Sequence, residues 1–486
     1  MSNGALPDYV SMAKPNPAEN RAPWYKGTAP VYAGIFLWVA FYMEIAQGTI
    51  SQAGLGLSLL GLVIAALICH YLFYLVPGLL GMKTGYPLYV VGSSTYGTKG
   101  GFLLPGLLMG LLQFGWLAVN TALATDFILQ ATGRESAVSV VDEALVFNGS
   151  AAFTIIAIIW AAVAVFMAIK GIQYVGKVST YLPIVPLIMI LIVFFSNVGT
   201  VGDFTPAEDG KPLIGFLTII AIVVGFFATA GAAGVDFGMG NRNAKDVQLG
   251  GLVGIALAIV VAGGLPLIAI AGAHGANPEL GSFKFDSVIE THFLSKIMFI
   301  LFAVASFPAA CFCSFIAGNS IGTMFPKTNK TVMVAIGAVV AVILAATGWA
   351  LNLAGVFGII GASFGPICGS MAADYLLSGR KWAGPRKGIN LAGYIAWLVG
   401  FVVAILPMVG IPYLVDKGKF SFITPAPVIA FVIGFVLYYV LAKAGYEPPV
   451  VEMKATPAEA APEPAPVEAA PEQAPAEEAK EEEKSE

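Results

Sequence analysis

Long apolar stretches follow one another along most of this chain, separated by short polar segments. Twelve stretches can be marked, near residues 30–52, 56–79, 102–130, 151–169, 179–198, 213–238, 248–272, 293–318, 331–350, 354–377, 390–410 and 424–442. Most are close to the roughly 20 residues that an α-helix needs to cross a bilayer, and longer than the alternating segments of about 10 residues of membrane barrels. The pattern therefore predicts an all-α polytopic membrane protein with twelve transmembrane helices.

Composition and charge support this class of protein. Hydrophobic residues make up 58% of the 486 residues and charged residues 11%, which is more apolar surface than a soluble domain can hide. If the N-terminus is cytoplasmic, 16 Lys and Arg residues lie on inner connecting segments and six on outer ones. Positive residues gather on the cytoplasmic side. We therefore predict a multi-pass protein of the cytoplasmic (inner or plasma) membrane with both termini inside.

Four regions can be distinguished. Residues 1–29 form a polar N-terminal segment without a cleavable signal peptide, residues 30–377 a ten-helix transport core, and residues 378–445 two additional transmembrane helices. Residues 446–486 are rich in Pro, Ala and Glu, and 12 Glu against three Lys between 447 and 486 explain the net charge of −4. This segment is predicted to be a disordered acidic cytoplasmic tail. A regulatory or docking tail is the alternative.

Small and polar residues interrupt two of the apolar stretches. Ala46–Gly54 (AQGTISQAG) lies in the first stretch, and Ala228–Gly234 (ATAGAAG) lies in the sixth. Interruptions at matching positions five stretches apart indicate discontinuous helices in two related halves. Unwound backbone at membrane depth is tolerated only where it lines a cavity or is covered by protein. Alternatively, the small residues only permit close helix packing.

Polar side chains inside the first stretch are candidates for function. Glu44 precedes the interruption, and a carboxyl group there is protonated, paired with a cation or exposed to a water-filled cavity. Each option suits an ion-coupling site. Gln47, within the interruption, is a candidate substrate ligand. A neutral, hydrogen-bonded structural Glu44 is the alternative.

The third stretch carries Gln113, Trp116 and Asn120 at i, i+3 and i+7, so they share one helix face. An amide, an indole and a second amide can stack on a flat ring and hydrogen-bond its edge. We therefore predict a substrate-binding face. Phe226 and Phe227, just before the sixth interruption, are candidates for an opposing aromatic wall. Core packing is the alternative for these aromatic residues.

The remaining polar residues indicate structural roles. Asp236 and Asp374 lie near the cytoplasmic ends of stretches six and ten, beside Arg242 and Arg380, and are predicted to form gating or helix-end ion pairs. The cysteines and histidines show no disulfide or metal-ligand spacing. Without a phosphate-binding loop, a catalytic constellation or a nucleic-acid signal, we expect no enzyme, cofactor, metal, ATP or nucleic acid. The expected partners are a small-molecule substrate and the lipid bilayer.

Several short sequence motifs can be compared with those of known families. They are Gly81-Met82-Lys83-Thr84-Gly85, Gln113-Phe114-Gly115-Trp116, Asp236-Phe237 with Asn241-Arg242-Asn243-Ala244-Lys245, and Ala373-Asp374-Tyr375 with Arg380-Lys381. With these motifs the chain resembles the nucleobase–cation symport-1 family, the purine, cytosine, allantoin and hydantoin permeases, from about residue 20 to residue 439. The resemblance implies a five-plus-five inverted repeat with broken first and sixth helices and two peripheral helices. It also implies alternating access and cation-coupled uptake.

The resemblance implies roles for particular residues. In the family the tryptophan of the third span stacks on the substrate ring, and this residue is Trp116 here. The amides that hold the ring edge match Gln113 and Asn120. The aromatic residue of the sixth span is Phe226 or Phe227.

The sodium site of the family is the main departure. Its hydroxyls in span eight are replaced by Ala309–Cys313 (AACFC), which leaves Ser314 as the nearest hydroxyl, while Glu44 lies near its first-span side. We predict a cation-coupled symporter for a small nitrogen-containing heterocycle such as a nucleobase, driven by H⁺ or Na⁺. The alternative is a proton-coupled or uncoupled carrier of a small cationic or zwitterionic solute; a channel is less favoured, because no filter motif is present.

Overall fold

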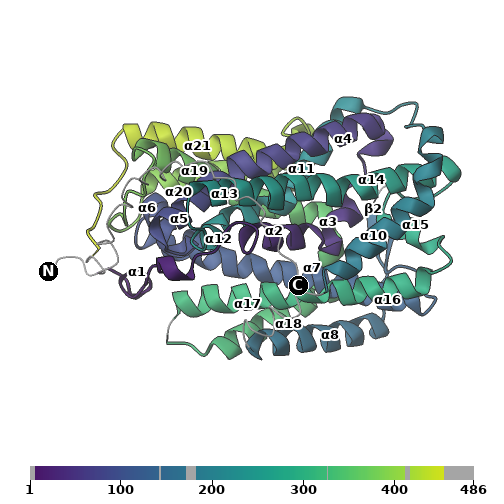
Figure 1. Ribbon diagram of the computed structural model, residues 1–486, viewed down its shortest axis with the longest axis horizontal. Helices are drawn as coiled ribbons and strands as arrows, with labels where there is room; N and C mark the ends of the chain where they lie inside the picture. The colour runs from purple at the N-terminus through teal and green to yellow at the C-terminus, as the bar shows by residue number, and fades with distance from the viewer. Residues whose placement is uncertain (1–5, 142–143, 171–181, 326, 411–415, 454–486) are drawn as a thin grey trace, which may run out of the picture. The chain divides into compact units, whose positions relative to one another are not determined.

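The computed structural model describes residues 6–141, 144–170, 182–325, 327–410 and 416–453. These residues are almost entirely helical (Figure 1), with one antiparallel hairpin of β1 (Val138–Val141) and β2 (Ala144–Phe147). The start of the fifth predicted span and most of the predicted acidic tail, from residue 454 onward, lie outside the described residues.

Ten helices in the described part of the chain are long and apolar enough to cross a membrane. They are Ile50–Thr84 (α4, η2, α5), Phe102–Ala131 (η3, α7), Ala151–Lys170 (α8), Ile184–Asp203 (α10, η4), Pro212–Ala232 (α11), Ala244–Ala276 (α13, η5, α14), Ser295–Met324 (α16, α17), Leu353–Leu377 (α19), Leu391–Val409 (α20) and Ala426–Lys443 (α21). Each corresponds to one predicted span.

The two other predicted spans are formed by shorter helices. The first consists of α2 (Thr28–Phe36) and α3 (Val39–Glu44), and the ninth is α18 (Lys330–Ala346), an apolar helix of 17 residues. The count of twelve stays a prediction. The remaining short elements are α1 (Asp8–Ser11), η1 (Ala18–Asn20), α6 (Leu88–Tyr96), α12 (Gly234–Gly238), α15 (Phe285–Glu290), η6 (Trp349–Leu351) and η7 (Lys417–Phe420).

The first helix is broken at a different place from the predicted one. The gap between α2 and α3 lies at Leu37 and Trp38, where Trp38 has an extended backbone (φ −64°, ψ 131°). The prediction that Ala46–Gly54 forms the break is therefore wrong. This stretch contains the turn after α3, with Gly48 at φ 67°, and a kink at Gly54 (φ 70°). Glycines that adopt positive φ produce the same sequence pattern in a turn as in a broken helix.

The sixth helix is interrupted inside the predicted stretch. α11 ends at Ala232 and α12 begins at Gly234, with Ala233 between them. α12 packs closely on α5, because a Cβ at Gly238 would overlap the carbonyl oxygen of Gly78 and a Cβ at Gly81 would overlap that of Val235. Small residues at such crossings let helix backbones approach within a membrane.

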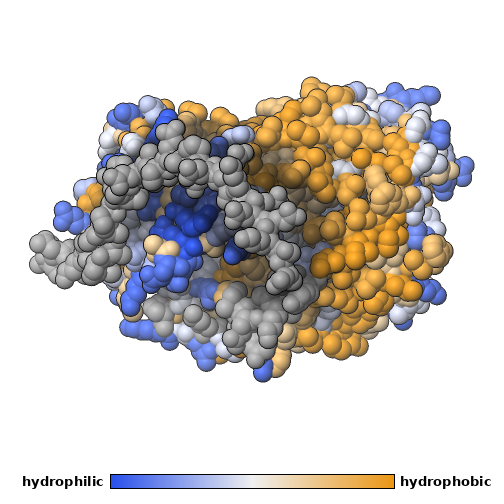
Figure 2. Space-filling model, viewed as in Figure 1, coloured by the Kyte–Doolittle hydropathy of each residue, from blue (hydrophilic) through white to orange (hydrophobic). Residues whose placement is uncertain are grey.

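The outward faces of the helices are apolar. α8, α17 and α18 lie side by side in Figure 1, and the exposed residues of α8 include Ile155, Ile158 and Ile159. Figure 2 shows hydrophobic side chains gathered over much of the visible surface. A surface of this kind is solvated by lipid rather than by water, which agrees with the apolar spans.

The contact between α5 and α12 yields a first prediction. Gly81→Ala should destabilise the protein by about 1–3 kcal/mol, because its methyl group would overlap the backbone of α12. Gly115→Ala is the matched control, since nothing lies within 4 Å of a Cβ there. Thermal unfolding in detergent measures both. Equal Tm values for the two variants would contradict the close approach.

Candidate functional site

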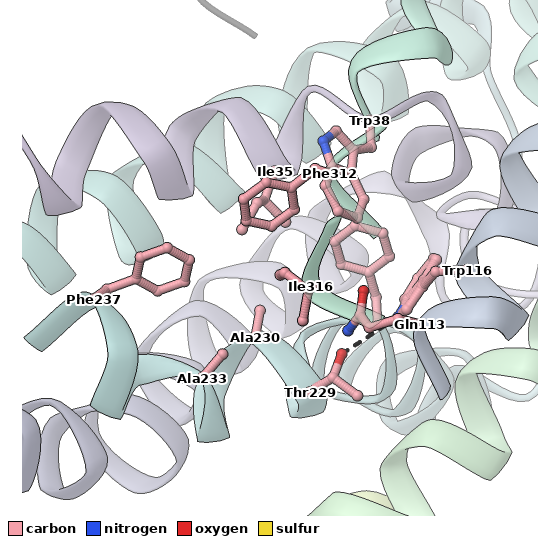
Figure 3. Close-up of a pocket in the computed structure, with 11 residues that line it drawn as sticks. Ile35, Trp38, Gln113, Trp116, Thr229, Ala230, Ala233, Phe237, Phe312 and Ile316 are labelled. Atoms are coloured by element: carbon pink, nitrogen blue, oxygen red, sulfur yellow. Dashed lines mark hydrogen bonds between the residues drawn. The ribbon is translucent and has the colours of Figure 1, made fainter. Parts of the chain in front are cut away.

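A cavity lies between the two interrupted helices, α7 and α17 (Figure 3). Its walls are Ile35, Trp38, Gln113, Trp116, Phe226, Thr229, Ala230, Ala233, Phe237, Phe312 and Ile316. The first two residues lie at the break of the first helix, and Ala233 lies at the interruption of the sixth. Both interruptions therefore border one cavity, as irregular backbone at membrane depth should.

Two polar side chains, Gln113 and Thr229, face this cavity near Trp116. The Trp116 Nε1 donates a hydrogen bond of 3.3 Å to the Thr229 hydroxyl. The Gln113 amide donates only to the Met109 sulfur, at 3.5 Å, and its Oε1 has no hydrogen-bond partner among the described residues, although the side chain is 95% buried. A buried amide without a partner is costly. Gln113 is therefore free to hydrogen-bond a ligand.

Aromatic rings surround Trp116. Its ring centroid lies 5.1 Å from Phe226 with an interplanar angle of 79°, 5.7 Å from Phe357 of α19 and 6.0 Å from Trp38. Trp38 also meets Phe312 at 6.1 Å. The sequence interpretation missed Trp38, because the first interruption was expected after it; no local pattern marks the apolar Leu37–Trp38 step as a break.

Three of the six predicted substrate-binding residues line the cavity: Gln113, Trp116 and Phe226. Phe227 instead stacks on Phe36 at 5.7 Å. The Asn120 Nδ2 donates to the Trp116 carbonyl oxygen at 2.8 Å, and its Oδ1 has no partner in the described chain. Gln47 lies in the turn after α3. The binding roles of all six residues stay predictions.

The two predicted ion-coupling residues are not in contact. Glu44 ends α3, is 92% buried, and interacts electrostatically with Lys284 and Asp286, which precede and begin α15. The Ser314 hydroxyl donates to the Ala310 carbonyl oxygen at 2.9 Å. Ser314 lines a second cavity between α8, α17 and α18. The two side chains thus have different surroundings, and their ion-coupling roles stay predictions.

The predicted ion pairs are wrong in their partners. Arg242 pairs with Asp246 at 2.9 Å, one helical turn away, and Asp374 pairs with Arg386 at 2.8 Å. Asp236 accepts a hydrogen bond of 3.0 Å from the Leu88 amide at the start of α6. Proximity in sequence suggested Arg242 and Arg380 as partners of the two aspartates. Instead, Arg242 pairs with Asp246 because they are spaced i,i+4, and Asp374 pairs with Arg386 because the loop after α19 folds back.

Arg380 has a structural environment of its own. It adopts φ 60° after the end of α19, and its carbonyl oxygen accepts a hydrogen bond of 2.7 Å from Lys83.

All four cysteines are free and buried. Within the described residues, no group of three His, Cys, Asp or Glu side chains could hold a metal ion.

The apolar helices, the two helix interruptions and the cavity between them define a polytopic membrane carrier. The chain matches, over residues 23–434, the family described as permeases for cytosine/purines, uracil, thiamine and allantoin, and it belongs to that family, the nucleobase–cation symporters. The members are transporters and not enzymes. The predicted class and family are thereby confirmed.

Relatives and solved structures agree with this assignment. The chain is 27% identical to a cytosine permease of Escherichia coli over 360 residues, which cover 72% of this chain and 78% of the relative. The inward-facing conformation of Mhp1 superposes with a TM-score of 0.67 at 16% identity, covering 91% of this chain and 95% of Mhp1. A closed conformation of Mhp1 with bromovinylhydantoin bound gives 0.62 at 18% identity, covering 90% and 95%. These structures show the fold.

The connection between α14 and α16, which contains α15, yields a second prediction. Burial raises the pKa of Asp286 to about 6, with Lys284 opposing the shift. The folded state thus binds a proton that the unfolded state releases near pH 4, so this group's contribution to stability falls as pH rises from about 4 to about 6. Since one pKa unit corresponds to about 1.4 kcal/mol, Asp286→Asn should remove up to about 3 kcal/mol of the loss between pH 4 and 7, measured by thermal unfolding. An unchanged pH profile would contradict the raised pKa of Asp286.

Proposed function

We propose that this protein is a cation-coupled symporter that carries a small, flat, neutral nitrogen heterocycle, of the cytosine or purine kind, across the cytoplasmic membrane. The observation that carries the proposal is the Gln113 amide, buried without a full set of partners beside the Trp116 ring in the cavity. An amide offers one donor and one acceptor edge, which matches the edge of a lactam or amidine ring. The adjacent indole offers a face for stacking.

The charge of the cavity favours a neutral substrate. Its eleven described lining residues carry no ionisable group. A cation buried there would lose its hydration without gaining an opposite charge, which is strongly unfavourable. This argues against the alternative of a small cationic solute in the same cavity. Acidic groups are found instead at the outer end of the first helix, where Glu44 and Asp286 interact.

The relatives support the heterocycle. The matching Escherichia coli protein is a cytosine permease, and one Mhp1 structure holds bromovinylhydantoin. Cytosine and a hydantoin are both small planar rings with amide-like edges. We infer a substrate of the same chemical class and assign to Gln113 the hydrogen bonds to its edge.

The fold supports transport by alternating access. The interruptions at Leu37–Trp38 and Ala233 fit a five-plus-five inverted repeat whose first and sixth helices are broken, with α20 and α21 as the two peripheral helices. We propose twelve transmembrane helices, counting α2–α3 and α18, and cytoplasmic termini. The cavity would then open alternately to the two sides of the membrane.

For the coupling ion, we propose a proton taken up at Glu44. Glu44 is a buried carboxyl group at the end of the broken helix, and no hydrogen bond from a described residue reaches it. Ser314 uses its hydroxyl on its own helix and faces another cavity. The described side chains therefore give sodium little beyond backbone oxygens, whereas a carboxyl group can take and release a proton.

Trp116→Ala tests the stacking wall. Base–aromatic stacking contributes about 1–3 kcal/mol, so the variant should bind cytosine about 10- to 100-fold more weakly and take up correspondingly less. Trp160→Ala in α8, which packs on Phe307 at 5.7 Å outside the cavity, is the matched control. Tritiated cytosine, uracil, hypoxanthine and a hydantoin serve as ligands. Full binding of every ring compound by Trp116→Ala would rule out the stacking role.

Gradient-driven uptake into proteoliposomes tests the transport function and its ion. With the same heterocycles and with small amines, we expect uptake of a heterocycle under an inward proton gradient and little under sodium. Glu44→Gln should abolish the proton-driven accumulation while exchange of substrate across the membrane persists. Accumulation driven by sodium alone would reject the proton site, and uptake of amines alone would reject the neutral heterocycle.

A further inference from the structure

A buried group of charged and polar side chains lies apart from the cavity, and none of its members lines it. It comprises Ser94, Asp374, Arg386, Tyr438 and Glu447, and we refer to it as the clasp. Asp374 and Arg386 are each 4% exposed, Ser94 and Tyr438 are 1% and 0% exposed, and the Glu447 side chain, at 23%, is only partly buried. Its members come from α6, α19, the loop after α19, α21 and the segment that follows α21.

Arg386 is the centre of the clasp. Its Nη1 donates to an Asp374 carboxylate oxygen at 2.8 Å and to the Ser94 carbonyl oxygen at 2.6 Å, and its Nη2 donates to Glu447 at 2.9 Å. The Tyr438 hydroxyl donates to the same Glu447 oxygen at 2.7 Å. Burial would lower the pKa of Arg386, but Asp374, Tyr438 and Glu447 raise it overall. The guanidinium therefore stays charged, and Asp374 and Glu447 each accept a hydrogen bond from one of its Nη atoms.

The segment that carries Glu447 is fixed by its backbone as well. The Lys387 amide donates to the Pro449 carbonyl oxygen at 2.9 Å, and the Val451 amide donates to that of Pro385 at 2.7 Å. Arg386 and Val450 thus form an antiparallel bridge. We call residues 447–451 the strap. It is held against the loop after α19 by one ion pair and two backbone hydrogen bonds.

Two of the helices joined by the clasp, α6 and α19, do not line the cavity but are linked to residues of its wall. α19 carries Asp374 at one end and, about 25 Å away along the helix, Phe357, whose ring lies 5.7 Å from that of Trp116. α6 is linked to the clasp by the Arg386 amide, which donates to the Ser93 carbonyl oxygen at 3.1 Å. The start of α6 donates to Asp236, the neighbour of cavity-lining Phe237.

We propose that the clasp is a conformational latch, in which Glu447 and the strap stabilise the present arrangement of α6 and α19 around the cavity. A rearrangement that separates α6 from α19 must break the contacts of Arg386 or carry the strap with it. If Glu447 leaves, Asp374 still balances the charge of Arg386, but the Arg386 Nη2 and the Tyr438 hydroxyl lose their partner inside the protein, so the latched arrangement is favoured while Glu447 is bound. The strap thereby gives the chain beyond α21 a direct influence on the cavity. This inference does not depend on the identity of the substrate or the ion.

The test measures access to the cavity without a substrate. Ala233→Cys places a thiol on the cavity wall, and the rate of its reaction with a membrane-impermeant maleimide is followed in inside-out membrane vesicles. The native cysteines are buried, and the chain without Ala233→Cys gives the background. Adding Glu447→Gln should change the rate of this reaction about fivefold or more, the lower range of typical conformational couplings. Glu452→Gln, an exposed charge just beyond the strap, is the matched control and should change nothing.

Tyr438→Phe provides a second variant. It removes only the hydroxyl that donates to Glu447 and accepts a hydrogen bond from the Asn390 Nδ2. It should change the labelling rate in the same direction as Glu447→Gln. Size-exclusion profiles in detergent show whether each variant is folded. If Glu447→Gln does not fold, the labelling rate of Tyr438→Phe tests the latch. Labelling rates of the folded clasp variants equal to that of Glu452→Gln would overturn the latch.

Discussion

Within a bilayer, every backbone amide and carbonyl group must find a partner inside the protein. The first helix leaves its regular i→i−4 pairing at Leu37 and Trp38, whose amides bond to carbonyl oxygens three residues back instead. Such an interruption persists only beside a cavity or under a cover of protein. Here it meets the interruption at Ala233, and α7 and α17 complete the wall of one cavity. The position of the cavity, its few polar groups and the contacts of Trp116 all depend on this meeting of two broken helices.

The cavity is mostly apolar and aromatic, so its selectivity rests on very few groups. Gln113 and Thr229 are its polar side chains, and Thr229 already accepts from Trp116. A ligand amide or lactam would satisfy the Gln113 oxygen that has no partner in the described chain. Charges are instead placed at the ends of the helices, at Glu44 with Asp286 on one side and at the clasp on the other. This separation fits a carrier whose substrate is neutral and whose conformational changes involve charged groups.

Hydrophobic length gave the spans, because a membrane helix leaves a long apolar run in the sequence. Hydrophobic length could not predict the break at Leu37–Trp38, because the sequence is apolar on both sides of it, and it did not predict that α18 is short. Helical spacing brought Gln113 and Trp116 together, since these residues share one face of α7. It could not place Asn120 outside the cavity wall, because that depends on how α3 and α11 cross α7. The pairing of Asp374 with Arg386 depends on a loop that folds back, and no local pattern records it.

The most direct test of this account is protection of the cavity by its substrate. A thiol introduced by Ile316→Cys lies on the cavity wall, whereas one introduced by Ser314→Cys lies in the second cavity. The account predicts that cytosine or a related neutral heterocycle slows the reaction of the first thiol with a small maleimide and leaves the second unchanged, and that small amines protect neither. Protection by amines alone, or of Ser314→Cys rather than Ile316→Cys, would contradict the assignment of this cavity to a neutral heterocycle.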